Sequence, residues 1–207
     1  MKFLKCFKIS LIIAMLIAAI NVNAADNDIL LQKLFDLTSY KANFEQTVTD
    51  SSGKVLQSSE GNLSMLRPNY FRMEITSPDE SILSADGNAV YSYDELLEQV
   101  TIYDFSKQVA DSPLMLLITK DPKVWENYNV KSISTDNFVI TPKVASGLIK
   151  SMELKLENSI LTNLVVTELD GKANSYVFKS PSTAQLNESD LKFTIPKGVD
   201  IDDQRSK

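Results

Sequence analysis

The segment from Gly61 to Tyr93 most tightly constrains what this chain can fold into, because short alternating runs in it are separated by strong turn signals. Phe71, Met73 and Ile75 alternate with polar residues, which is the period-2 pattern of a half-buried strand. Turn signals stand at Arg67-Pro68-Asn69, Pro78-Asp79 and Asp86-Gly87-Asn88. Proline cannot donate to a β-ladder, and Asp, Asn and Gly favour turns. The segment therefore predicts three strands and the start of a fourth.

The rest of the chain continues this pattern with one interruption. A helix is predicted over residues 26–39, and it either packs on a sheet face or plugs the end of a barrel. Residues 104–128 lack period 2, and Ser112-Pro113 and Asp121-Pro122 are signals for the starts of two short helices. Further strands are predicted at 40–49, 54–66, around 100–102, 129–134, 137–143, 147–157, 160–170 and 172–180, with a short one in the 191–207 tail.

A sheet of that many strands curls rather than staying flat. We therefore predict a mainly β fold with some α, an unclosed antiparallel half-barrel of about eleven strands. The helices within 104–128 are either ordinary core or a lid over an apolar cavity.

The first 24 residues have the features of a cleaved secretory signal. Three lysines precede an apolar run from Ile9 to Ile20, and Val22-Asn23-Ala24 supplies the small residues that a signal peptidase reads. We expect cleavage after Ala24 and a single mature domain over residues 25–207, exported to the periplasm.

Composition excludes several function classes. Without the three lysines of residues 1–24, the chain has 18 Lys and Arg against 27 Asp and Glu, a net charge of −9 that disfavours nucleic-acid binding. Histidine is absent, and the only cysteine, Cys6, lies in the signal. These absences argue against histidine-dependent and thiol catalysis and against metal sites built from those residues. We expect no enzyme activity, no catalytic residues, no metal and no cofactor.

Apolar residues remain as the candidates for function. They either fill a small β core or line a cavity for acyl chains, to which flexible methionines would adapt. The candidates are Phe44, Leu63, Met65, Phe71, Met73, Ile75, Ile82, Tyr91, Leu114, Met115, Leu117 and Trp125.

Eight short motifs, in order along the mature chain, resemble the LolA family of periplasmic lipoprotein carriers. They are Phe44-Glu45-Gln46, Gly61-Asn62-Leu63, Arg67-Pro68-Asn69-Tyr70-Phe71, Pro78-Asp79-Glu80-Ser81-Ile82-Leu83, Asp86-Gly87, Ser112-Pro113-Leu114-Met115-Leu116-Leu117, Phe138-Val139-Ile140-Thr141-Pro142-Lys143 and Asp202-Asp203-Gln204-Arg205. The resemblance implies an unclosed β-barrel with a helical lid. It also implies a monomer that accepts triacylated lipoproteins from an inner-membrane ABC transporter and delivers them to an outer-membrane receptor.

The resemblance also assigns roles to single residues. Arg67 matches the family's lid latch, an arginine bonded to lid carbonyls, which here would come from about Leu116, Leu117 and Ile118. Phe71 matches an aromatic residue of the cavity mouth. Ser64 and Arg72 stand where the resemblance leads us to expect aromatics. The alternative is a lipid-binding sensor or receptor on the same fold, although a receptor would need a lipid-attachment cysteine where Ala24-Ala25 stand.

Overall fold

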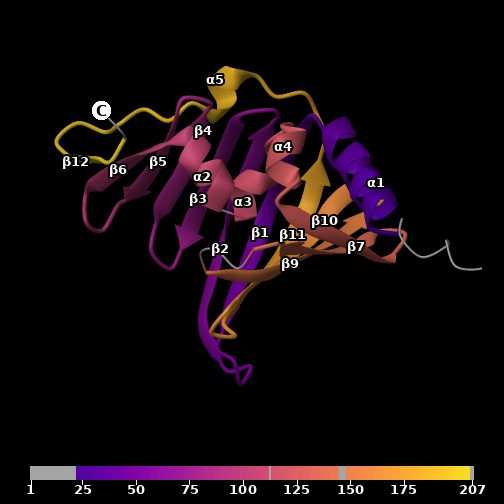
Figure 1. The fold of residues 1–207 in the computed structure, drawn as a ribbon. Coiled ribbons are helices and arrows are strands. Elements are labelled where there is room, and N and C mark those ends of the chain that lie inside the picture. Colours follow the sequence, from indigo (N-terminus) through magenta and orange to yellow (C-terminus); the bar gives the residue numbers. More distant parts are fainter. Residues whose placement is uncertain (1–21, 112, 145–147, 206–207) are drawn as a thin grey trace, which may run out of the picture.

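Twelve strands form one sheet that curves without closing, as the computed structural model shows (Figure 1). The structure describes residues 22–111, 113–144 and 148–205. The strands are β1 (Ser39–Thr49), β2 (Val55–Leu66), β3 (Tyr70–Ser77), β4 (Ser81–Asp86), β5 (Ala89–Asp94), β6 (Gln99–Asp104), β7 (Tyr128–Ser134), β8 (Asn137–Pro142), β9 (Ile149–Glu157), β10 (Ile160–Glu168), β11 (Ala173–Ser182) and β12 (Asp200–Asp203). Their order across the sheet is β12-β6-β5-β4-β3-β2-β1-β11-β10-β9-β8-β7, so β12 and β7 are its two edges.

The described residues form five helices, most of them very short. They are α1 (Val22–Asp36), α2 (Phe105–Asp111), α3 (Pro113–Leu116), α4 (Pro122–Trp125) and α5 (Glu188–Leu191). Helix α1 packs along the edge strand β7, where Lys33 pairs with Asp136 at 3.0 Å and Asp26 accepts a 3.0 Å hydrogen bond from the Ser132 amide. Helices α2, α3 and α4, here called the lid, lie between β6 and β7 in the chain and on the concave side of the sheet (Figure 1).

Strand register sorts the side chains into two faces. Phe44 pairs with Gly61 and Phe178, and Leu63 with Met73, so these residues share the concave face. One cluster of buried side chains joins this face to α1 and the lid. The main core therefore lies inside the curved sheet and beneath the helices.

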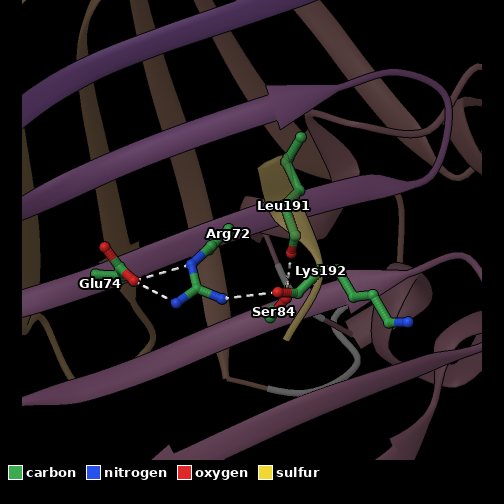
Figure 2. Close-up of polar contacts among 5 residues, drawn as sticks. All are labelled: Arg72, Glu74, Ser84, Leu191 and Lys192. Atoms are coloured by element: carbon green, nitrogen blue, oxygen red, sulfur yellow. Dashed lines mark hydrogen bonds and ion pairs between the residues drawn. The ribbon is translucent and has the colours of Figure 1, made fainter. Parts of the chain in front are cut away.

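A second, smaller core lies on the convex face under the C-terminal segment, residues 187–205, which we call the strap. Its side chains from sheet and strap are Ala89, Tyr91, Tyr93, Val100, Ile102, Phe193, Ile195 and Val199. Ser84 donates a 3.2 Å hydrogen bond to the Leu191 carbonyl (Figure 2). Arg72 donates to the Lys192 carbonyl at 3.3 Å and pairs with Glu74 (Figure 2). Ser64 pairs with Arg72 in the ladder, so both residues face the convex side and not the cavity.

The structure corrects several predicted elements. The twelve strands agree with the predicted number of about eleven, but β12 pairs parallel with β6, which departs from an all-antiparallel sheet. The first helix ends at Asp36 instead of residue 39, because Ser39 already belongs to β1. The lid contains α2 in addition to the two predicted helices. Asp121 caps α4 as predicted, by accepting from the Lys123 amide.

Some predictions concern residues that are not described. Residues 1–21 of the expected signal and the expected cap Ser112 lie outside the described residues. Within the described ranges, no helix is both long enough and apolar enough to span a bilayer.

Candidate functional site

Arg67 lies at the point where β2, α1 and the lid meet. It follows the last residue of β2, and its side chain is only 6% exposed. Its Nε donates a 2.8 Å hydrogen bond to the Leu117 carbonyl in the lid, and its Nη1 donates to the Leu37 carbonyl just after α1. Its own amide donates to the Thr38 carbonyl at 2.8 Å. One buried guanidinium thus joins the end of α1 to the lid.

Helix ends explain why an arginine fits this position. The last carbonyls of a helix have no partner within it and carry partial negative charge. Leu37 follows α1 and Leu117 follows α3, so Arg67 sits at two such ends. Burial lowers the pKa of Arg67 to about 10, and the guanidinium therefore stays charged at neutral pH. Among the described residues, no carboxylate lies within ion-pair distance of Arg67, so backbone carbonyls are its partners.

The lid inserts a short apolar segment into the concave side of the sheet. Met115, Leu116, Leu117 and Ile118 are each no more than 1% exposed. Hydrogen bonds from the amides of Leu117 and Ile118 to the carbonyls three residues earlier, at 3.2 Å, hold the segment in a tight turn. The only hydrogen bond from Arg67 to this part of the described lid goes to Leu117, not to Leu116 or Ile118.

Most of the predicted lining residues lie together beneath this segment. Residues from sheet and lid that are buried in the one cluster are Phe44, Leu63, Met65, Phe71, Met73, Met115, Leu117 and Trp125. Ile75 and Leu114 are half-buried and pack against it. The eight buried members are each at most 7% exposed and pack in this cluster with the lid closed over the sheet. The predicted cavity is therefore filled by the lid in this structure.

Two predicted lining residues lie elsewhere. Glu74 pairs with Ile82 and Ser84 with Tyr91, which puts Ile82 and Tyr91 on the convex face. Tyr91 packs there against Phe193 of the strap, with ring centroids 5.7 Å apart. Apolar residues occur on both faces of these strands because the strap covers the outer one, and the sequence pattern alone did not separate the two faces.

The sequence did not reveal two features of the site. The Leu37 carbonyl joins the Arg67 contacts, although nothing in the residue pattern pairs the end of α1 with that arginine. The only tryptophan of the chain, Trp125, is 1% exposed, and its indole N–H has no hydrogen-bond acceptor within the described structure.

Comparison with known proteins assigns the chain to a family. The family model described as outer membrane lipoprotein carrier protein LolA matches residues 36–194, which include Arg67 and the whole lid. The chain belongs to the LolA family. Two relatives carry the name outer-membrane lipoprotein carrier protein. The one from Serratia proteamaculans is 40% identical over 85% of this chain and 87% of its own length. The one from Glaesserella parasuis is 38% identical over 86% of this chain and 85% of its own length.

A solved structure with low sequence identity shares the fold of this chain. An uncharacterized conserved protein from Thermus thermophilus superposes with a TM-score of 0.56. The match covers 84% of this chain and 97% of that one, at 14% sequence identity. The curved sheet is therefore shared well beyond the close relatives.

Proposed function

We propose that this protein is a carrier that holds the acyl chains of lipoproteins between its sheet and its lid. The observation that carries the proposal is the lid's arrangement: its apolar residues fill the concave side, while Arg67 holds it there through carbonyl bonds. A lid held in this way can leave and return. The names of the relatives support a lipoprotein as the cargo.

The carrier and its cargo would compete for one apolar surface. Burying an acyl chain contributes about 0.8 kcal/mol per methylene, so one full chain is on the order of 10 kcal/mol. Complete burial of three chains would make release too slow for a shuttle. Because Met115 to Ile118 bury themselves on the same face when no cargo is present, closing the lid offsets part of that binding energy.

The acyl chains would lie on the concave face of β1, β2 and β3, against Phe44, Leu63, Met65, Phe71 and Met73. Leu114, Met115, Leu117 and Trp125 would cover them from the lid, with Ile75 at the margin. Arg67 would act as the latch of the empty state, through Leu117 and Leu37. Ile82 and Tyr91 have no part in this proposal.

Partners and location follow from the same proposal. Cargo would be triacylated lipoproteins taken from an inner-membrane ABC transporter and passed to an outer-membrane receptor, with the carrier acting as a monomer in the periplasm after removal of residues 1–24. The family description names a carrier, and no enzymatic role is proposed for this histidine-free chain.

Identification of what co-purifies with the protein from a periplasmic extract tests the proposal. Native mass spectrometry should find a chain that begins at Ala25, in part as a one-to-one complex with a triacylated protein. Free phospholipid as the sole ligand would support the sensor alternative instead. A chain that never takes up acylated protein, even after incubation with inner-membrane vesicles that release lipoproteins, would contradict the carrier.

A further inference from the structure

A chain of polar side chains crosses the concave face where the apolar surface ends. Gln46 Nε2 donates to the Tyr176 hydroxyl at 3.0 Å and to Asn174 Oδ1 at 3.3 Å. Asn174 Nδ2 in turn donates to Glu168 Oε1 at 3.3 Å. We call these four residues the polar ladder. They come from β1, β10 and β11, which are neighbours in the middle of the sheet (Figure 1).

The polar ladder is continuous with the apolar surface under the lid. Gln46 is the next residue after Phe44 on the same face of β1. The Tyr176 ring meets Phe44 edge-on at 5.9 Å and stacks on Phe178 at 6.4 Å. Tyr176 is buried, whereas the other three members of the ladder are only half-buried. A ligand whose hydrocarbon part lay on Phe44 would therefore reach the ladder with its next polar group.

The hydrogen bonds within the ladder leave a donor on Tyr176 and an acceptor on Gln46 without a partner in the ladder. A tyrosine hydroxyl both donates and accepts, and a glutamine amide has two N–H hydrogens and a carbonyl oxygen. Gln46 uses its two hydrogens on Asn174 and Tyr176, so neither bond engages its carbonyl oxygen or the hydroxyl hydrogen of Tyr176. Burial raises the pKa of Tyr176 to about 12, and its hydroxyl therefore keeps its proton at neutral pH.

We propose that the polar ladder is the subsite for the ester- and amide-linked head of an acylated cysteine, and that it sets the depth to which acyl chains enter. This inference rests on the proposed carrier function. An ester carbonyl of the head accepts from the Tyr176 hydroxyl, and an amide N–H of the head donates to the Gln46 carbonyl. A ligand with hydrocarbon but no carbonyl gains nothing from the ladder.

The test compares two ligands and two matched tyrosine variants. The ligands are a synthetic triacylated cysteinyl peptide and an analogue in which ether links replace both glyceryl esters at equal chain length. Affinity is measured by displacement of a fluorescent fatty acid. Tyr176→Phe removes only the hydroxyl of the ladder. Tyr93→Phe removes a hydroxyl on the convex face, where Tyr93 packs against Phe193 at 6.0 Å, and serves as the control.

The wild type should bind the ester peptide about two- to tenfold more tightly than the ether analogue, which corresponds to one neutral hydrogen bond. Tyr176→Phe should abolish this preference, and Tyr93→Phe should keep it. If Tyr176→Phe does not fold, Gln46→Met, which retains side-chain length, tests the other contact. It should lower the affinity for both peptides, because both keep the amide N–H that donates to the Gln46 carbonyl, and unchanged affinity for both would overturn the subsite.

Two outcomes would overturn the subsite without touching the carrier function: a wild type with no ester preference, or a Tyr176→Phe variant that keeps it. A wild type that binds neither ligand would overturn the proposed function itself, and the subsite with it.

Discussion

The guanidinium of Arg67 bonds to the carbonyl of Leu117 at 2.8 Å across a sequence separation of 50 residues. This bond joins the end of β2 to the lid, and the bond from Arg67 to Leu37 joins the same side chain to the end of α1. Hydrogen bonds from a charged donor contribute about 1.5–3 kcal/mol each. The bonds of this one arginine therefore supply a large part of the free energy that holds the short lid helices in the closed position.

Phe71→Glu should block loading of cargo. Phe71 is fully buried between β2 and β4, opposite Met65 and Ala85, on the face that the acyl chains would occupy. A carboxylate there has no partner in the apolar cluster, and it repels hydrocarbon even if it turns outward. Transfer of lipoprotein from inner-membrane vesicles to the purified variant should fall by at least about tenfold.

Tyr70→Glu is the matched control for that variant. Tyr70 precedes Phe71 on β3, faces the opposite side of the sheet and is only half-buried. The control should load normally. Normal loading of a folded Phe71→Glu protein, judged by its circular dichroism, would contradict the placement of Phe71 in the site.

Gly61→Ala should destabilise the concave face of the sheet around Phe44. A Cβ at residue 61 would lie 1.9 Å from the Glu74 carbonyl oxygen and 2.6 Å from the ring of Phe44, so the ring packs where only glycine fits. Overpacking of this kind costs about 1–3 kcal/mol, measured as a lower free energy of unfolding in urea. Gly53→Asn is the control, because nothing lies within 4 Å of a Cβ there and asparagine tolerates its φ of +84°. Equal stability of Gly61→Ala and the wild type would show that Phe44 does not pack as described.

Release of cargo should not depend on pH between 6.5 and 8.5. Burial lowers the pKa of Arg67 to about 10. The free-energy cost of burying its charge is therefore fully present below pH 10, and it disappears only as the pH rises toward the pKa of the arginine in the unfolded chain. The charge of Arg67 thus stays constant between pH 6.5 and 8.5. The chain has no histidine that could titrate in the tested range. Stopped-flow transfer to an acceptor membrane at three pH values measures the rate. A transition near pH 7 would require another titrating group in the lid.

The alternating runs of apolar and polar residues predicted most of the strands. They did not predict which side chains face the lid in strands that contribute to both cores. In β4, Ile82 and Leu83 are adjacent and both apolar, so alternation cannot say which of them faces the lid. The strap decides it by covering the convex face with Phe193 and its neighbours, and no local pattern predicts that contact. The parallel pairing of β12 with β6 depends on the same long-range return of the chain.

The sequence was more informative about Arg67 than about its partners. Proline at residue 68 and the alternation before it placed Arg67 at the end of a strand, where the structure has it. The contact with Leu37 needed the three-dimensional fold, because backbone carbonyls leave no trace in the residue pattern. The residue pattern does not predict the polar ladder for a related reason: Gln46 and Asn174 lie far apart in the sequence, and only the pairing of β1 with β11 brings them together.

The affinity of Arg67→Leu for a triacylated cysteinyl peptide tests the competition between lid and cargo most directly. If Arg67 holds the lid closed only when the site is empty, loss of about 2 kcal/mol from that state should raise the apparent affinity by up to about thirtyfold, with slower transfer to an acceptor. Arg72→Leu, on the convex face, should change neither quantity. An Arg67→Leu protein that is folded and binds the peptide no more tightly than the wild type would contradict competition between lid and cargo.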